Sequence, residues 1–496
     1  MTWGALAPRL LGDAGIGWHI RNGEQMLRTH AITRIDQFSS TMSGRPWFAW
    51  EWLYDLAIAS IHERLGLNGV VFFTALVIAA TFALTFRLTL RRAVLPVAVI
   101  LLMLSVGAST IHFFARPHVV SWLFAVIWFQ LLDSSEIISG RETDRRLLWL
   151  PVLMLLWVNL HGGFLLGLAL LGLYLLAGLI EYSRYREGQK DAARQRLKHL
   201  RAVTLLSLLA SLINPYGYTL HVHVYRYLSD RWLMNHIDEF LSPNFHGMAQ
   251  QCFAALLLIT IVALAIAPKK PQLSHLFVII FAAYSGLYAA RNLPVSSILL
   301  TLIIAPLLSQ AVAEARTNPD LPHLLRAFFS RCELFTSRMG SMELRFRGHG
   351  WPVAAVIFGL FVCVQHGRLG YLQLMDARFD AKRFPVQAAE VIAQRGIAEP
   401  IFSPDSWGGY LIYRLYPQTR VFVDDRHDLY GEQFLKGYLK VIRVAPDWDK
   451  VLNEKRMNWV LVPAGSSLAN ILKETSQWTV TYEDSVAVLF HRTKTL

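Results

Sequence analysis

Long apolar segments separated by short charged loops are the feature that most constrains this 496-residue chain. Several of them approach the roughly 20 residues that cross a bilayer as a helix. Only 17% of the residues are charged, against about a quarter in soluble domains. The sequence therefore predicts a polytopic α-helical membrane protein with about ten transmembrane helices. The apolar blocks cover residues 68–90, 94–110, 119–133, 147–160, 163–181, 202–214, 251–267, 275–290, 293–313 and 351–366.

Basic residues are concentrated in alternate loops, which indicates how the chain is oriented. Cytoplasmic loops of membrane proteins retain Lys and Arg. The formal net charge of +13 is then mainly a topology signal, and nucleic acid is not an expected partner. With the basic loops inside, both ends of the chain lie outside. The basic loops are residues 87–92, 141–146, 184–201, 269–270 and 314–350.

This topology divides the chain into three regions. Residues 1–67 form a first extracytoplasmic loop, 68–366 the transmembrane helical domain, and 367–496 an extracytoplasmic soluble α/β domain. Tryptophan-rich amphipathic stretches are typical of helices lying in the membrane interface, and 46–66 and 218–242 have this pattern. Because the chain begins outside without a signal segment, we expect that a first transmembrane helix is missing.

The third region alternates short apolar runs with helical stretches, which is typical of an α/β domain. Helices are expected at 385–396, 430–444, 446–456 and 467–475. The expected strands are "EPIFS", "TRVFVDD", "NWVLVP", "QWTVTYED" and "VAVLFHR".

Polar motifs interrupt the apolar blocks, and all of them are assigned to the outer ends of spans. They are "FARPH", "VNLHGG", "INPYG" and "ARNLP", and Asp13 and His19 lie on the same side. Irregular backbone at membrane depth is tolerated only where it lines a cavity or is buried in protein. Ionisable residues at that depth indicate a functional site. We therefore predict an outward-facing pocket that contains Asp13, His19, Arg116, His118, Asn159, His161, Tyr216, Arg291 and Asn292.

The residue types in this pocket favour chemistry on a phosphate ester. Arg116 and Arg291 suit a phosphate clamp, because guanidinium groups bind phosphate through charge-assisted and often bidentate hydrogen bonds. Asp13 suits a general base or a ligand for a divalent cation. A sugar carried on a lipid phosphate has a weakly basic leaving group, so one carboxylate and a phosphate clamp suffice. These residues therefore favour sugar transfer from a polyprenyl-phosphate donor.

Each motif also has a purely structural interpretation. Arg116 and Arg291 could extend to lipid headgroups, and His118 and His161 could make hydrogen bonds in helix turns. "NPYG" could be a helix stop, and Asp13 could cap the following helix. "VDDRHDLYGE" is interpreted mainly as a polar strand-to-helix turn, with cation or sugar binding as the alternative.

Several motifs together resemble the GT-C superfamily of membrane glycosyltransferases, and within it a large group of bacterial multi-spanning proteins. They are "GDAGIGWHIRNGEQML", "IDQFSSTMSGRPWFAWEWL", "FARPH", "NLHGGF", "NPYG", "ARNLP", "DSWGGYLIYRL" and "VDDRHDLYGE". The resemblance implies that Asp13, an acidic residue of the first outer loop, is the catalytic base or a ligand for a cation such as Mg²⁺ or Mn²⁺. Many such enzymes have a second acidic residue in this loop, for which Glu24, Asp36 and Glu51 are the candidates.

The resemblance also implies the partners and the location. We expect a lipid-linked sugar donor, a glycan, lipid or protein acceptor, and a position in the bacterial cytoplasmic (inner) membrane. In this hypothesis Asp13 and His19 are catalytic, the two arginines bind phosphate, and the other pocket residues position the substrates. A non-catalytic scaffold or subunit of a membrane assembly is the second hypothesis, and a transporter with broken helices is the third.

Overall fold

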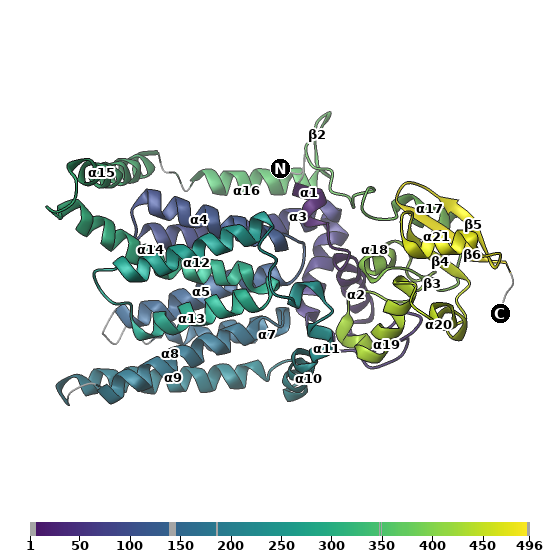
Figure 1. Ribbon diagram of the computed structural model, residues 1–496, viewed down its shortest axis with the longest axis horizontal. Coiled ribbons are helices and arrows are strands. Elements are labelled where there is room, and N and C mark those ends of the chain that lie inside the picture. Colours follow the sequence, from purple (N-terminus) through teal and green to yellow (C-terminus); the bar gives the residue numbers. More distant parts are fainter. Residues whose placement is uncertain (1–5, 138–144, 185–186, 347, 349, 494–496) are drawn as a thin grey trace.

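The structure is a computed structural model, and it describes residues 6–137, 145–184, 187–346, 348 and 350–493. Most of these residues belong to a bundle of roughly parallel helices, and a small sheet domain sits at one end of the bundle (Figure 1). The bundle consists of α3 (Trp52–Leu90), α4 (Leu95–Ser109), α5 (His118–Ile137), α7 (Trp149–Leu160), α8 (Phe164–Arg184), α9 (Glu187–Ser211), α12 (Met248–Ile266), α13 (Leu273–Tyr288), α14 (Leu293–Thr317) and α16 (Gly350–Val364).

Each of the ten apolar blocks lies largely within one of these helices, as the sequence predicts. Within the described residues, five helices are long and apolar enough to cross a membrane: α3, α4 with the turn after it, α8, α12 and α14 with the turn before it. Shorter apolar helices occur at His118–Ser134, Leu273–Tyr288 and Gly350–Val364. Helices satisfy their own backbone hydrogen bonds, so an apolar segment can cross lipid in this form. The chain therefore has a polytopic helical membrane fold.

The predicted interfacial helix and the first span are the two parts of α3. They are divided at Gly66, whose backbone is not helical. Gly66 has a φ of 60°, a conformation that favours glycine, and this allows the chain to change direction where it enters the apolar block. The second predicted interfacial stretch contains α10 (Tyr218–Ser229), α11 (Arg231–Met234) and the 3-10 turn η2 (Asp238–Phe240).

The end of the bundle next to the C-terminal sheet carries the remaining helices of the first loop and the short turns between spans. α1 (Leu6–Leu10) and α2 (Ile16–Thr29) lie on the same side as the C-terminal sheet (Figure 1). The turns η1 (Thr110–His112) and η3 (Ala290–Asn292) precede α5 and α14. α15 (His323–Phe346), from the basic 314–350 loop, lies at the opposite end. The basic loop and the polar motifs are thus at opposite ends of the bundle.

The C-terminal domain is a four-stranded mixed sheet with helices around it. The strand order is β3-β4-β6-β5, in which β3 and β4 are parallel and the other pairs are antiparallel. A separate hairpin, β1 (Arg368–Leu369) and β2 (Leu372–Gln373), follows α16. The elements are α17 (Val386–Gln394), β3 (Ile401–Phe402), α18 (Asp405–Leu415), α19 (His427–Ile442), α20 (Trp448–Glu454), β4 (Trp459–Pro463), α21 (Ser467–Glu474), β5 (Trp478–Glu483) and β6 (Ala487–Arg492).

The strand predicted at "TRVFVDD" is not a strand of this sheet. Val421 makes isolated parallel bridges to Ser39 and Ile401, and the chain then turns toward α19. Its backbone thus joins the first outer loop to the C-terminal domain. The other four predicted strands and all four predicted helices are confirmed, whereas α18 was not predicted.

Close backbone contacts and one buried ion cluster attach the C-terminal domain to the first loop. A Cβ on Gly17 of α2 would lie 2.1 Å from the carbonyl oxygen of Gly409 in α18, so only glycine allows these helices to approach so closely. Arg426, whose side chain is 1% exposed, binds Asp36 Oδ1 at 2.8 Å and Asp424 Oδ2 at 2.6 Å. This contact surface positions the candidate site.

Candidate active site

Three charged residues from distant parts of the chain meet at the end of the bundle that faces the C-terminal domain. Nη1 of Arg116, in the turn before α5, donates to Asp13 Oδ1 at 2.8 Å and to Asp425 Oδ2 at 2.5 Å. Trp18 Nε1 of α2 donates to the other oxygen of Asp425 at 2.9 Å. Because both carboxylates bind the same nitrogen, neither occupies the Nε and Nη2 donors of Arg116, for which the described part of the chain shows no hydrogen bond. This edge of a guanidinium suits a phosphate group.

Gly15 makes this meeting sterically possible. A Cβ at this position would lie 2.2 Å from Nη1 of Arg116 and 2.5 Å from Oδ2 of Asp425. The backbone amide of Gly15 also donates to Asp13 Oδ1 at 2.8 Å. Asp13 thus accepts one hydrogen bond in the turn before α2, but the N-cap residue of α2 is Gly15, so Asp13 does not cap this helix as the structural interpretation expects. It also binds Arg116, which the functional hypothesis places in the same pocket.

The two carboxylates around Arg116 differ in how readily they ionise. Burial opposes ionisation of Asp13, but the Arg116 charge and the Gly15 amide outweigh it and lower its pKa below the ordinary value. Burial raises the pKa of Asp425, and the negative charges of Asp13 and Asp424 add to that rise despite Arg116. Asp13 is therefore ionised at neutral pH and holds its proton weakly, which makes it a poor proton acceptor.

Glu51 lies behind this cluster, between two histidines. Its Oε2 is 3.8 Å from His19 Nε2, and its Oε1 is 3.6 Å from His161 Nε2. The Glu51 side chain is only 12% exposed. Burial raises its pKa to about 8, although the charges of Arg116 and Arg291 act in the opposite direction. Glu51 therefore carries a proton at neutral pH.

His19 connects Glu51 to a second buried carboxylate. Its Nδ1 is 2.5 Å from Asp55 Oδ1, and the other oxygen of Asp55 accepts from Asn22 Nδ2 at 2.6 Å. The His19 side chain is fully buried, and its Nε2 makes no hydrogen bond within the described residues. Burial, followed by the nearby charge of Arg116, lowers the pKa of His19 well below 6.5, so the ring is neutral.

The partners of His161 fix its tautomer. The Gly163 amide donates to His161 Nδ1 at 3.0 Å, and Ser121 Oγ lies 2.7 Å from the same nitrogen. Trp157 Nε1 donates to that Ser121 oxygen, so the serine hydroxyl is free to donate to His161. A nitrogen that accepts an amide hydrogen carries none itself. The ring hydrogen of neutral His161 is therefore on Nε2, the atom that faces Glu51.

The other predicted pocket residues use their polar atoms within the protein. Asn159 Oδ1 accepts from Trp52 Nε1 at 2.8 Å, and Tyr216 Oη accepts from the Ala49 amide at 2.9 Å. These two bonds fix the backbone on either side of Glu51. His118 Nε2 lies 2.8 Å from the carbonyl oxygen of His112, and Asn292 Nδ2 donates to that of Ser285 at 3.1 Å. Such contacts within the protein are typical of residues that position the backbone around a site.

The second predicted phosphate ligand has a different carboxylate partner. Arg291 Nη1 is 3.2 Å from Glu239 Oε1, and its guanidinium lies over the ring of Phe240 at 4.6 Å. Its positive charge opposes the rise in the pKa of Glu51, and it adds to burial in lowering the pKa of His161. The charges of Arg116 and Arg291 thus act on the same two residues, but the two guanidinium groups are paired with different carboxylates.

The donor set does not fit a divalent cation held by protein alone. Within the described residues, no group of three or more His, Cys, Asp or Glu side chains could hold a metal ion. Asp13 and Asp425 already share one cation, the guanidinium of Arg116.

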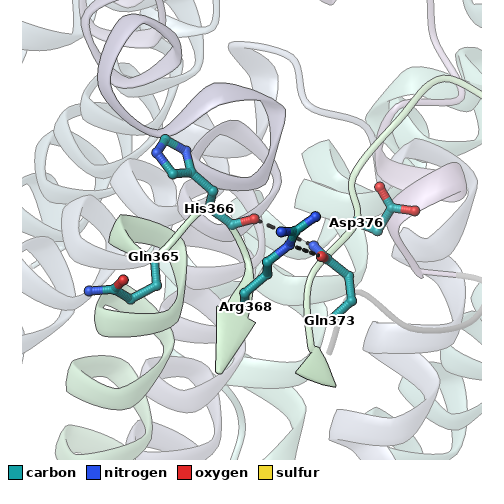
Figure 2. A pocket seen from close by; sticks show the side chains of 5 residues that line it. All are labelled: Gln365, His366, Arg368, Gln373 and Asp376. Atoms are coloured by element: carbon teal, nitrogen blue, oxygen red, sulfur yellow. Dashed lines mark hydrogen bonds between the residues drawn. The ribbon is translucent and has the colours of Figure 1, made fainter. Parts of the chain in front are cut away.

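Two surface cavities lie beside the C-terminal domain and are lined by none of the cluster residues. One, of about 500 Å³, follows α16 and is lined by Gln365, His366, Arg368, Gln373 and Asp376. Figure 2 shows Arg368 turned toward Gln373, with the Arg368 Nε to Gln373 Oε1 bond at 2.9 Å. The other, of about 600 Å³, lies between Leu67 near the α3 kink and Tyr413 of α18.

Three residues of the site were not among the predicted pocket residues. Trp18 belongs to the quoted motif "GDAGIGWHIRNGEQML" but was given no role, Asp55 lies in no quoted motif, and Asp425 belongs to a motif interpreted mainly as a turn. Glu51 was one of three candidates for a second acidic residue. The signal that could have distinguished Glu51 and Asp55 is their spacing of four residues at the start of a helix, which places them on one face.

Solved structures with similar folds belong to membrane glycosyltransferases. ArnT from Cupriavidus metallidurans is 13% identical, with a TM-score of 0.50 over 96% of this chain and 93% of that one. An oligosaccharyltransferase from Archaeoglobus fulgidus is 10% identical, with a TM-score of 0.52 over 93% of this chain and 67% of that one. No protein-family model and no curated protein sequence matches the chain. Both structures are of the GT-C superfamily, and the chain has a GT-C-like fold, as its sequence motifs predicted.

Proposed function

We propose that this protein is a glycosyltransferase that moves a sugar from a polyprenyl-phosphate donor to an acceptor at the outer face of the bacterial cytoplasmic membrane. The observation that carries the proposal is the convergence of Asp13, Arg116 and Asp425 with the buried Glu51 at the outer end of a membrane bundle. A GT-C-like fold is consistent with glycosyl transfer in general. The proposal goes further than the fold in two respects. It names a polyprenyl-phosphate donor, and it places the transfer at the outer face of the membrane.

The charged cluster suggests how the donor would bind. Arg116 binds the donor phosphate through its Nε and Nη2 edge, while Asp13 and Asp425 hold Nη1 and fix the plane of the guanidinium. As the bond between the anomeric carbon and the phosphate oxygen breaks, negative charge grows on the phosphate. Arg116 stabilises that charge more in the transition state than in the ground state, which is the condition for catalysis.

The contacts of Asp13 favour a third role beside the predicted base and cation ligand, that of an anion that orients Arg116. A carboxylate that accepts from an amide and an arginine is a weak base, because removing those bonds costs free energy. Asp13 therefore positions Arg116, and the acceptor proton goes to another group. Arg291 contributes a second positive charge near the same site.

A transfer assay tests this proposal directly. The purified protein would be reconstituted in proteoliposomes with radiolabelled hexosyl and pentosyl polyprenyl phosphates and a bacterial envelope extract as acceptor. We expect transfer by the wild type, and a loss of about 10²–10³-fold in Arg116→Met, because one preformed donor to the developing charge is removed.

Arg226→Met is the matched control, because Arg226 is an exposed arginine of α10 on the same side of the bundle. It should transfer at the wild-type rate. If the wild type transfers no sugar and binds polyprenyl phosphate no better than Arg116→Met does, the enzyme proposal fails. A scaffold or subunit role would then be the better hypothesis.

A further inference from the structure

We propose that the cavity of about 500 Å³ after α16 binds the headgroup of a membrane phospholipid that carries both a phosphate and an ammonium group, as phosphatidylethanolamine does. Three observations support this site: its place at the end of an apolar helix, the exposed apolar side chains beside it, and the opposite charges that line it. Its volume is within the range of small-ligand sites, roughly 300–1,000 Å³. The inference goes beyond sugar transfer, because this lipid is a bilayer component and not the sugar donor.

The end of α16 brings the cavity to the level of the lipid headgroups. Apolar side chains are exposed along this helix, among them Trp351 at 75%, Ile357 at 63% and Val364 at 55%. In a bilayer such side chains contact the acyl chains of lipids. Gln365 and His366 directly follow Val364, the last residue of α16, and both line the cavity. The cavity therefore begins where the chain leaves the apolar layer, which is the depth of the lipid phosphate groups.

The hairpin of β1 and β2 supplies further apolar side chains next to the cavity. It projects to the side of the bundle at the end of α16 and does not join the C-terminal sheet (Figure 1). Leu369, Tyr371 and Leu372 are 39%, 108% and 64% exposed. Such side chains are typical of a membrane interface. Arg368 and Gln373, which pair at the base of the hairpin, line the cavity, so its polar lining lies beside side chains that suit lipid.

Arg368 is held in an orientation that suits a phosphate group. Its Nε donates to Gln373 Oε1 at 2.9 Å, and within the described residues no hydrogen bond uses its two Nη groups. Figure 2 shows its guanidinium between the ring of His366 and the carboxylate of Asp376. Guanidinium groups bind phosphate through charge-assisted hydrogen bonds, and a neutral imidazole adds one donor. Arg368 and His366 thus suit the phosphate of a headgroup.

Asp376 favours a headgroup that also carries a positive charge. Its side chain is 52% exposed, and its Oδ2 lies 3.5 Å from Nη2 of Arg378, which is itself 80% exposed. Ion pairs as exposed as this one contribute little, so Asp376 can exchange Arg378 for a ligand. A carboxylate accepts hydrogen bonds from a primary ammonium group, whereas it repels a headgroup that is only anionic. The opposite charges of the cavity therefore match those of phosphoethanolamine.

The backbone that lines the cavity is fixed before any ligand binds. Asn68 of α3 holds both ends of the segment 366–377, because its Oδ1 accepts from the Ala377 amide at 2.8 Å and its Nδ2 lies 3.4 Å from the carbonyl oxygen of His366. Gly367 has a φ of 84°, and a Cβ there would lie 2.0 Å from the carbonyl oxygen of Met375. A site fixed in this way loses little conformational freedom when a ligand binds.

Lipid retention tests the inference. The protein would be released from nanodiscs made of equal amounts of phosphatidylethanolamine and phosphatidylglycerol, and native mass spectrometry would count the lipids that stay bound. We expect the wild type to retain phosphatidylethanolamine several-fold better. Arg368→Met should lower this retention about tenfold, because the charge-assisted contact with the phosphate is lost. Asp376→Asn should still retain a phospholipid but lose the preference, because only the partner of the ammonium group is removed.

Two exposed charges of the C-terminal domain provide the matched controls. Arg395 and Glu454 line neither of the two cavities, so Arg395→Met and Glu454→Gln should retain the two lipids in the wild-type ratio. Arg368 and Asp376 are exposed as well. Thermal unfolding of all four variants should therefore match that of the wild type, and a folding defect would not explain a change in lipid retention.

Soluble glycerophosphoethanolamine distinguishes a membrane lipid from a free phosphate ester. It has the same headgroup without acyl chains, so it should displace the lipid only in large excess. A variant with Tyr371→Ser and Leu372→Ser should retain less lipid and bind the soluble headgroup as the wild type does, because only apolar contacts are removed. Displacement of the lipid by an equal concentration of glycerophosphoethanolamine would overturn the assignment to a membrane lipid.

Two further results would also contradict the inference. One is equal retention of phosphatidylethanolamine and phosphatidylglycerol by the wild type, and the other is retention by Arg368→Met at the wild-type level. Neither result would affect the glycosyltransferase proposal, because the measurement contains no sugar donor. A protein that transfers no sugar but retains phosphatidylethanolamine through Arg368 and Asp376 would lose the proposed activity and keep this lipid site.

Discussion

Gly15 is the residue on which the charged cluster depends most directly. We predict that Gly15→Ala abolishes the joint contact of Asp13 and Asp425 with Arg116, because the added Cβ would lie 2.2 Å from Nη1 of Arg116. Forcing a methyl group into such a space typically costs about 1–3 kcal/mol of unfolding free energy. Sugar transfer and thermal unfolding of the purified variant would measure both effects, and we expect transfer to fall further than stability.

Gly172→Ala is the control for this substitution. A Cβ on Gly172, in α8, would meet no atom within 4 Å. An alanine inside a helix is favoured over glycine by up to about 1 kcal/mol, so this variant should be as stable as the wild type or slightly more stable. Equal transfer by Gly15→Ala and Gly172→Ala would contradict the steric argument.

For single residues, the sequence predicted which residues belong to the site better than it predicted which of them contact one another. The proximity of Asp13 and Arg116 was predicted from topology and is found at 2.8 Å. Asp425 is 309 positions from Arg116, and no local pattern specifies a contact over that separation. Arg291 was predicted beside the same anion and instead binds Glu239, because η2 places a nearer carboxylate next to it.

At the scale of elements, α15 presents an apolar face that no other described element covers. Leu324, Phe328 and Phe335 are 82%, 58% and 51% exposed and recur at helical spacing, with exposed Arg331 and Arg338 beside them. Such a helix lies in a membrane interface, with its arginines among anionic headgroups. Cys332, which lies within this helix, is a natural reporter of that position.

We predict that Cys332 reacts slowly with a water-soluble maleimide in anionic bilayers. A variant with Arg331→Glu and Arg338→Glu should react several-fold faster, because repulsion from anionic headgroups lifts α15 from the interface; each basic residue near such a surface contributes about 1 kcal/mol. Both proteins would carry Cys252→Ala and Cys363→Ala, so that only Cys332 is labelled. Equal labelling rates in anionic and zwitterionic nanodiscs would contradict the prediction.

Secondary structure was predicted well where one physical signal dominates. Apolar blocks long enough to cross lipid became helices, and alternating apolar runs became β4, β5 and β6. α18 was missed because Gly408 and Gly409 weaken its local helix propensity, while both are needed for contact with neighbouring backbone. "TRVFVDD" has the composition of a strand, but Val421 pairs with two different segments by single bridges.

For the whole molecule, the attachment of the C-terminal domain rests on Arg426. We predict that Arg426→Met lowers the free energy of unfolding by about 3–5 kcal/mol, because Asp36 and Asp424 would be left as buried charges without their cation. The C-terminal domain should then become susceptible to limited proteolysis at lower temperature than in the wild type. Thermal unfolding in detergent would measure the change.

Two further variants make this prediction specific. Arg420→Met replaces an exposed arginine of the same segment and should change stability by no more than about 0.5 kcal/mol. Adding Asp36→Asn and Asp424→Asn to Arg426→Met removes the unpaired charges and should recover part of the lost stability. A triple variant less stable than Arg426→Met would show that the arginine acts through packing against Trp47 and its neighbours.

The shared contact of Arg116 with Asp13 and Asp425 has a consequence for biogenesis. Asp13 leaves the ribosome before the helices of the bundle, and Asp425 follows only after every described helix of the bundle has been made. The cluster can therefore assemble only in a polypeptide whose synthesis has passed the bundle and reached Asp425. A nascent or truncated chain would expose Arg116 with one counter-ion missing, so transfer activity would report on complete maturation of the protein.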